Sequence, residues 1–134
     1  MPTRRTIRVV AAVLEKDGRY LITQRRPAAV LPLLWEFPGG RVEEGEVDAA
    51  ALKREFSHRL GATIECGKLI SFVTHPYEHY AVDLFLYECR ILGGELERRA
   101  VNDFKWVTSG EFEQYPFTPA DEASMSKLLG EHDN

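Results

Sequence analysis

The sequence predicts an α/β fold, in which a mixed sheet forms a sandwich with helices on both of its faces. Segments rich in β-branched residues, with alternating apolar and polar positions, occur in both halves of the chain. Between them, residues 47–60 contain neither proline nor glycine and have helical periodicity, and a second helical segment closes the chain. Because strand and helix segments alternate, stacked layers are the economical arrangement.

Length and composition predict one globular domain over residues 1–134. The chain has 44% hydrophobic and 28% charged residues, enough to enclose a core. Its formal charge of -4 argues against polymeric nucleic acid as a partner, since such proteins bind phosphates through clustered Lys and Arg. No apolar run approaches the roughly 18 residues that span a bilayer, and no signal-peptide pattern is present. We expect a cytoplasmic protein with no membrane partner and reduced thiols at Cys66 and Cys89.

The first half of the chain opens with a predicted β-hairpin. Residues 7–15 and 20–25 form its strands, and residues 16–19, which include Gly18, form the turn. Residues 27–34 (PAAVLPLL) contain two prolines, which remove backbone donors, so we expect a loop over a pocket rim. A short strand at 35–37 is expected to stop at Pro38, Gly39 and Gly40, where glycine permits sharp backbone geometry.

Residues 47–60 are predicted to form an amphipathic helix that ends at Gly61 in the left-handed conformation. At about 100° per residue, one stripe of this helix is apolar and is expected to face the core. Its members are Ala49, Leu52, Phe56 and Leu60. A separate stripe carries Glu55, His58 and Arg59, and this is the face that carries chemistry.

The second half of the chain predicts two long strands, at 63–75 and 79–90, joined through residues 76–78. Another strand is expected at 104–107 and a short helix at 109–114. Residues 119–129 predict a terminal helix, with Pro119 near its first turn. Its apolar positions are Ala123, Met125, Leu128 and Leu129. Residues 131–134 are expected to be a frayed tail.

Residues 40–62 (GRVEEGEVDAAALKREFSHRLGA) follow the spacing of a known catalytic motif. They resemble the Nudix box, Gx5Ex7REUxEExGU, in which U is aliphatic. The residues in register are Gly40, Glu46, Arg54, Glu55, Phe56, Gly61 and Ala62. The resemblance is strongest to the MutT-like branch and covers almost the whole chain, through the segments LITQRRP, WEFPGG, VNDFKWV and YPFTPAD. It implies a Nudix-type α/β/α sandwich and hydrolysis of a diphosphate bond in a nucleotide or nucleoside diphosphate derivative, with Mg or Mn as cofactor if the chain is active.

The resemblance also implies site residues. The backbone carbonyl of Gly39 and the carboxylate of Glu55 match metal contacts, and Glu46 and Arg54 match residues that support the box. The matches to substrate-binding positions at the phosphate or base end of the pocket are Arg25, Phe37, Arg41 and Asp121. Each of three residues also has a purely structural alternative. Arg25 could be a solvated strand end, Phe37 a core aromatic, and Asp121 a helix N-terminal acid favoured by the helix dipole.

The chain departs from the family pattern at the centre of the box. Both positions 58 and 59 carry Glu in the pattern, whereas this chain has His58 and Arg59. A guanidinium group offers only donors and cannot coordinate a metal, and Glu55 followed four residues later by Arg59 favours an ion pair on the helix. A further acidic ligand is often found at the position of Ala100, although Glu97 is close in sequence.

The sequence supports three hypotheses of function. The first is a protein that binds nucleoside di- or triphosphates through a degenerate box, with hydrolysis weak or lost. The second is an active, metal-dependent nucleoside triphosphate pyrophosphohydrolase that recruits substitute ligands among Glu43, Glu44, Glu46, Glu95 and Glu97. The third is a protein-binding scaffold that uses an exposed apolar patch such as residues 27–34. The sequence leaves the oligomeric state, the base and the leaving group open.

Overall fold

The structure is a computed structural model that describes residues 5–130, and side chains as far as residue 126. The strands are β1 (Arg5–Val13), β2 (Glu15–Lys16), β3 (Arg19–Gln24), β4 (Trp35–Glu36), β5 (Gly39–Arg41), β6 (Thr63–Pro76), β7 (Tyr80–Gly93) and β8 (Asp103–Val107). The helices are α1 (Asp48–Leu60), the 3-10 helix η1 (Ser109–Gln114) and α2 (Pro119–Gly130). The expected tail at 131–134 and the side chains of Leu128 and Leu129 lie outside this description.

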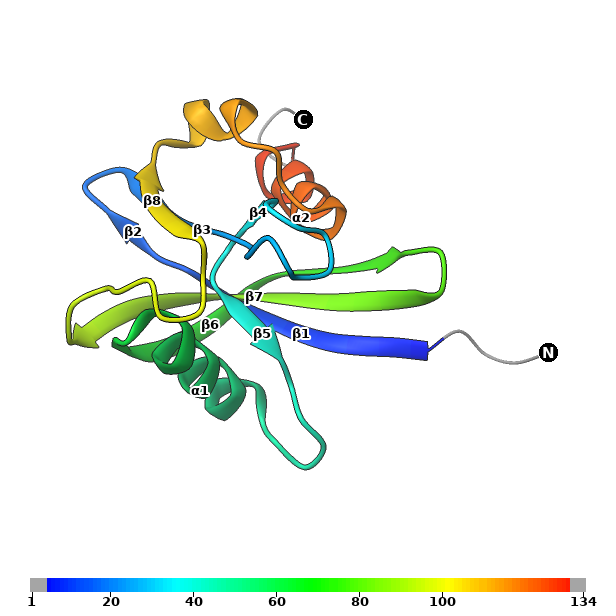
Figure 1. The fold of residues 1–134 in the computed structure, drawn as a ribbon, viewed down its shortest axis with the longest axis horizontal. Helices are drawn as coiled ribbons and strands as arrows, with labels where there is room; N and C mark the ends of the chain where they lie inside the picture. The colour runs from blue at the N-terminus through cyan, green and yellow to red at the C-terminus, as the bar shows by residue number, and fades with distance from the viewer. Residues whose placement is uncertain (1–4, 131–134) are drawn as a thin grey trace.

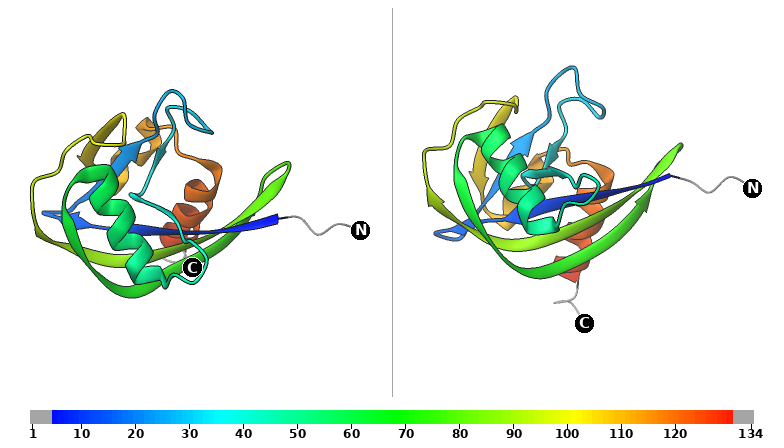
Figure 2. Two further views of the ribbon diagram at one scale, coloured as in Figure 1. Left: turned by 60° about the horizontal axis from the view of Figure 1, so that its bottom comes forward. Right: turned by 90° about the horizontal axis from the view of Figure 1, so that it is seen from below.

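A mixed sheet lies at the centre of the molecule, in the strand order β5-β1-β7-β6. Strand β1 pairs in parallel with β7, whereas β5 pairs antiparallel with β1 and β6 antiparallel with β7. The two predicted long strands, β6 and β7, form a hairpin that curves around the body of the protein (Figure 2). The mixed sheet of the predicted fold class is therefore confirmed.

A second, antiparallel sheet joins β2, β3, β4 and β8, and it corrects the expected first hairpin. Of the segment that was expected to form the first strand of the hairpin, only the short β2 pairs with β3. The longer β1 pairs with β7 in the mixed sheet instead. The reversal occurs at Asp17 and Gly18, whose φ angles of 52° and 78° suit a tight hairpin turn. Nonlocal pairing of β1 with β7 thus outweighs a continuous local hairpin.

The short strand expected at 35–37 does stop before Pro38, because β4 ends at Glu36. Gly39–Arg41 then forms a separate strand, β5, in the mixed sheet, and this strand was not predicted. Gly39 pairs with Ala11 of β1, and a Cβ at Gly39 would overlap the carbonyl oxygen of Val10. The glycine here therefore serves close packing of two strands. The proline-rich segment 27–34 has neither helix nor strand, as predicted.

Helix α1 ends at Gly61, whose φ of 76° confirms the predicted left-handed cap. Its buried side chains are Ala51, Leu52, Phe56 and Leu60. The expectation for Ala49 was wrong, because this residue is exposed. It lies in the first turn, and the buried set begins only at Ala51, so the packed part of the helix is shorter than its periodic stripe.

The two α-helices lie on opposite sides of the mixed sheet (Figure 1). One buried cluster packs α1 against the sheet through Leu52, Phe56 and Leu60. The other contains Trp35 and Phe37 together with Phe117 and Met125 from the C-terminal part of the chain. Within residues 5–130, the longest apolar helical segment falls short of what a membrane crossing requires.

Candidate functional site

The box residues meet where strand β5 faces helix α1. Gly40 contacts Glu55 so closely that a Cβ at Gly40 would overlap the Glu55 carboxyl group. Because Gly40 also pairs with Val10 of β1, its position is fixed by the mixed sheet. Glu55 therefore lies against the sheet, with 13% of its side chain exposed.

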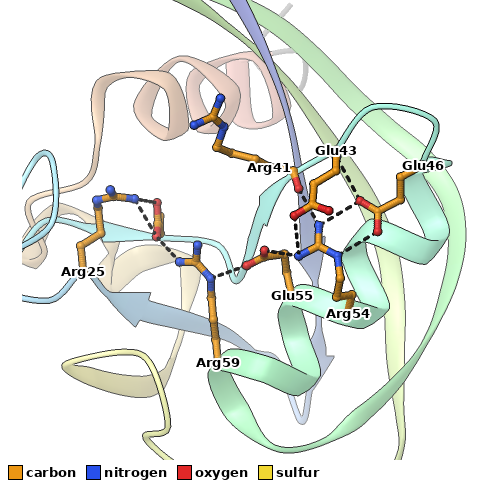
Figure 3. A network of polar contacts seen from close by, with 8 residues as sticks. Arg25, Arg41, Glu43, Glu46, Arg54, Glu55 and Arg59 are labelled. Carbon is orange, nitrogen blue, oxygen red and sulfur yellow. Dashed lines mark hydrogen bonds and ion pairs between the residues drawn. The ribbon is translucent and has the colours of Figure 1, made fainter.

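Arg54 connects Glu55 to the loop that precedes α1 (Figure 3). Its Nε and Nη2 atoms donate to the two carboxylate oxygens of Glu46 at 2.8 and 2.9 Å, and Nη1 donates to Oε1 of Glu55 at 2.6 Å. Nη2 also donates to the carbonyl oxygen of Arg41 at 3.0 Å. The hydrogen bonds from Arg54, with the backbone N–H of Glu43, lower the pKa of Glu46 to about 2. Glu46 and Arg54 thus hold the loop against the helix.

Arg59 occupies the other side of Glu55 (Figure 3). Its Nε donates to Oε2 of Glu55 at 2.8 Å, which confirms the ion pair predicted from the spacing of four residues. Its Nη1 lies 3.9 Å from Oε2 of Glu36, and Nη1 of Arg25 donates to both Glu36 oxygens at 3.1 and 3.3 Å. Arginines and glutamates therefore alternate from Arg25 to Glu46.

Both carboxylate oxygens of Glu55 are engaged, one by Arg54 and one by Arg59. Burial opposes the ionisation of Glu55, but the hydrogen bonds and charges of Arg59 and Arg54 outweigh it and lower its pKa. The carboxylate is consequently ionised at neutral pH, and it is already neutralised by two guanidinium groups.

A pocket of about 300 Å³, which we call the polar pocket, opens above this face of α1. It is lined by Arg25, Arg26, Ala29, Glu36, Glu55, His58, Arg59, Ala100 and Val101. Three guanidinium groups and two carboxylates face it, a formal charge of +1 with His58 neutral. Such a lining favours a small anionic group such as a phosphate.

A second pocket of about 330 Å³, the apolar pocket, shares Arg25 and Glu36 with the first. The remaining lining residues are Ile7, Val9, Val30, Leu31, Arg41, Tyr77, Tyr80, Val82, Leu84, Thr118, Ala120 and Asp121. Its walls are mostly aliphatic and aromatic, with a few polar groups, which suits a flat heterocycle. The loop 27–34 contributes to both pockets, as predicted for a rim.

Asp121 is the buried carboxyl group of the apolar pocket, with 5% of its surface exposed. Its Oδ1 accepts the backbone N–H of Phe37 at 2.9 Å, and its Oδ2 accepts the hydroxyl of Thr118 at 2.6 Å. Burial and the charge of Glu36 raise the pKa of Asp121 to about 7, against the lowering effect of these two hydrogen bonds. Asp121 therefore sits at the first turn of α2 and also borders the pocket, so both roles considered for it are compatible with its position.

The other residues expected to bind substrate are distributed differently. Arg25 and Arg41 line the apolar pocket, and Arg25 also lines the polar one. Phe37 is 4% exposed and packs against Phe112 and Phe117, so it is a core residue. In the part of the chain that the structure describes, it lines neither the polar nor the apolar pocket. Gly39 is buried within β5 and pairs with Ala11 of β1.

The substituted positions His58, Arg59 and Ala100 all line the polar pocket. His58 is exposed. The backbone N–H of Ala100 donates to the carbonyl oxygen of Arg59 at 3.0 Å, which holds this loop on the end of α1. Glu97, considered as a replacement acid, is exposed and pairs with Arg99 at 2.8 Å.

These side chains, as arranged, do not fit a divalent metal ion. Within residues 5–130, no cluster of three or more His, Cys, Asp or Glu side chains has the arrangement that holds a metal. Both carboxylate oxygens of Glu55 accept hydrogen bonds, one from Arg54 and one from Arg59. A guanidinium group has no lone pair with which to bind a metal ion. The donor set therefore suits an anion better than a cation.

Glu36 is the site residue that sequence reasoning missed. It stands between the buried Trp35 and Phe37 and points to the opposite side, where it meets Arg25 and Arg59. Burial raises the pKa of Glu36 against the lowering effect of these two arginines. A charged residue between two apolar residues of a strand was the available signal, since alternate side chains point to opposite faces.

Comparisons with known proteins agree with this architecture. The family model described as NUDIX domain matches residues 9–127. The chain is 33% identical over 115 residues to the CTP pyrophosphohydrolase of Escherichia coli (strain K12), covering 86% of this chain and 85% of that protein. It is 32% identical over 121 residues to a putative 8-oxo-dGTP diphosphatase 2 of Mycobacterium tuberculosis (strain ATCC 25618 / H37Rv), covering 90% and 86%.

Solved structures are similar over most of their length. The solution structure of the E. coli ORF135 protein has a TM-score of 0.79 at 29% identity and covers 96% of this chain and 92% of its own. The MutT protein from Methanosarcina mazei Go1 has a TM-score of 0.85 at 17% identity, covering 100% and 99%, and this likeness concerns the fold. With a family model over most of its length and relatives of this identity, the chain belongs to the NUDIX family.

Proposed function

We propose that residues 1–134 form one NUDIX domain that binds nucleoside di- or triphosphates across the polar and apolar pockets, and that its box is degenerate, so that hydrolysis is weak or lost. The phosphates lie in the polar pocket and the base in the apolar pocket. The observation that carries the proposal is the pairing of Glu55 with both Arg54 and Arg59.

The two adjoining pockets support binding of a nucleotide. Arg25 and Glu36 border both of them, so the pockets adjoin, and a ligand that fills both would reach from a polar to an apolar compartment. Guanidinium groups are well suited to phosphate oxygens, and the apolar walls to a base. The named activities of the relatives, on CTP and 8-oxo-dGTP, are compatible with ligands of this class.

The arrangement of Glu55 supports weak hydrolysis. Pyrophosphate bonds are cleaved in this family with metal ions that neutralise the phosphates and activate water. Replacing two of the acids by His58 and Arg59 removes carboxylate charge where it would be needed. A loss of several kcal/mol of transition-state stabilisation lowers a rate by several powers of ten.

An active nucleoside triphosphate pyrophosphohydrolase is the second candidate, and the relatives favour it more than they favour a loss of activity. In that case Glu55 would be freed from Arg59, and carboxylates from elsewhere would complete the site. Glu36 is the acid nearest to Glu55 within the polar pocket. Glu43 and Glu46 already form ion pairs with Arg54.

Binding and turnover measured side by side separate the two candidates. We expect titration calorimetry with CTP, dGTP and 8-oxo-dGTP to detect binding of at least one nucleotide. In the presence of Mg²⁺, we expect pyrophosphate release several powers of ten slower than that of the E. coli CTP pyrophosphohydrolase assayed in parallel.

Turnover at a rate similar to that relative, abolished by Glu55→Gln, would establish the second candidate and contradict a weak hydrolase. Absence of binding for every nucleotide tested would refute the binding function itself. The variant Arg98→Gln, at an exposed arginine outside both pockets, serves as the control for a change of charge.

A further inference from the structure

We propose that Arg59 takes the place of a divalent cation beside Glu55, so that the polar pocket binds the phosphates of a nucleotide without any divalent metal. This inference rests on the proposed nucleotide binding and adds what recognises the phosphates. It concerns a property that separates this chain from the metal-dependent pattern of its box.

The guanidinium group of Arg59 is positioned as a bridging cation. Arg59 lies between two carboxylates, with Nε 2.8 Å from Glu55 and Nη1 3.9 Å from Glu36. A cation that bridges two carboxylates at the edge of a phosphate site supplies part of the positive charge that a metal ion would supply there. The difference is that this cation is covalently part of the chain and carries hydrogen-bond donors.

Arg59 is held in place by contacts of its backbone and its side chain. Its carbonyl oxygen accepts the N–H groups of Arg99 and Ala100 at 3.1 and 3.0 Å, so the loop 94–102 fixes the last turn of α1. Its side chain is 28% exposed, and that of Arg25 is 23% exposed. Both guanidinium groups are therefore ordered by carboxylates while part of each surface still faces the pocket.

The charges around Glu55 favour an anion over a divalent cation. Glu55 already has one arginine on each oxygen, so a divalent cation entering here would have to displace Arg59 and would meet its positive charge. The pocket lining instead has an excess of positive charge with His58 neutral. An anion gains from this lining directly, because charge-assisted hydrogen bonds from Arg to phosphate are strong.

The consequence can be measured with inorganic triphosphate, which probes the phosphate subsite without a base. We expect the wild-type protein to bind it in metal-free buffer, and Mg²⁺ to leave the affinity unchanged or to weaken it, because Mg²⁺ neutralises the free triphosphate. We expect Arg59→Gln to weaken binding by roughly tenfold or more, as expected for the loss of a charged hydrogen bond. Arg98→Gln, the control outside the pockets, should change the affinity by less than about twofold.

A second readout does not depend on triphosphate binding. Electron paramagnetic resonance of free Mn²⁺ should detect no tight Mn²⁺ site in the wild-type protein, whereas Arg59→Glu, which restores a carboxylate, should bind Mn²⁺ more tightly. Thermal unfolding of each variant establishes that the comparison is between folded proteins.

Binding of triphosphate or nucleotide only in the presence of Mg²⁺ would overturn this inference and leave the proposed nucleotide binding intact. Tight Mn²⁺ binding by the wild-type protein, or an Arg59→Gln variant with undiminished affinity, would also overturn it. Absence of binding to every phosphate compound with and without Mg²⁺ would overturn both this inference and the proposed function.

Discussion

At the scale of single residues, Glu55 shows how a neighbour can change what a side chain is available to do. Its carboxylate is ionised and sits on the box helix, yet Arg54 and Arg59 each occupy one of its oxygens. The pair with Arg59 was predictable because residues four apart meet on a helix surface. The contact of Glu36 with Arg59 was not predictable, because β4 is distant from α1 in sequence.

Asp121 gives a pH dependence with a definite sign. Its pKa in the folded protein is about 7, above its ordinary value near 3.8, so folding takes up a proton between these two pH values. Its contribution to stability therefore falls as pH rises from about 4 to 7. Asn at this position has no charge to bury and can still accept the N–H of Phe37 at its Oδ1. Its Nδ2 can donate to Oγ1 of Thr118, which reverses the hydrogen bond that Thr118 donates to Asp121.

We expect Asp121→Asn to gain stability relative to the wild type as the pH is raised from 5 to 8, by at least about 1 kcal/mol in the free energy of unfolding. Urea unfolding of both proteins at the two pH values measures it. Glu122→Gln, at an exposed carboxylate of the same helix, is the matched control. A difference between Asp121→Asn and wild type that is the same at both pH values would show that Asp121 does not titrate in this range.

At the scale of elements, the junction of β5 and α1 sets the geometry of the site. Helix α1 and its cap at Gly61 followed from periodicity and glycine chemistry, which are local properties. The pairing of β1 with β5 and β7 did not, because strand pairing depends on residues far apart in sequence. The exposure of Ala49 likewise depends on where the helix meets the sheet.

Gly40→Ala tests this junction. The new Cβ would overlap the Glu55 carboxyl group, so Glu55 must move and its hydrogen bonds to Arg54 and Arg59 must lengthen or break. We expect a loss of about 1–3 kcal/mol in the free energy of unfolding, measured by chemical denaturation.

Gly93→Ala is the matched control, because a Cβ at Gly93 meets nothing within 4 Å. It should change stability by less than about 0.5 kcal/mol. If Gly40→Ala were as stable as Gly93→Ala, the contact between β5 and Glu55 would not constrain the site.

At the scale of the whole molecule, the core and the chemical face of the box helix are separate. Leu52, Phe56 and Leu60 pack into one buried cluster, while Glu55 and Arg59 face the polar pocket. The fold can therefore persist when residues of the chemical face change. The fold class was predictable from the sequence because it depends on the apolar pattern of the core-facing residues. The two adjoining pockets were not predictable, because they depend on how β4, α1 and α2 come together.

We propose, as the central claim, that Arg59 and its neighbour His58 limit the chemistry of an otherwise intact NUDIX fold. Mg²⁺-dependent release of pyrophosphate from CTP and 8-oxo-dGTP, compared between the wild type and the double variant His58→Glu/Arg59→Glu, tests it most directly. We expect the double variant to be at least about tenfold faster than the wild type, since restored carboxylates can hold a metal ion, and Glu55→Gln to abolish that gain. A folded double variant that is no faster than the wild type, or slower, would contradict the claim.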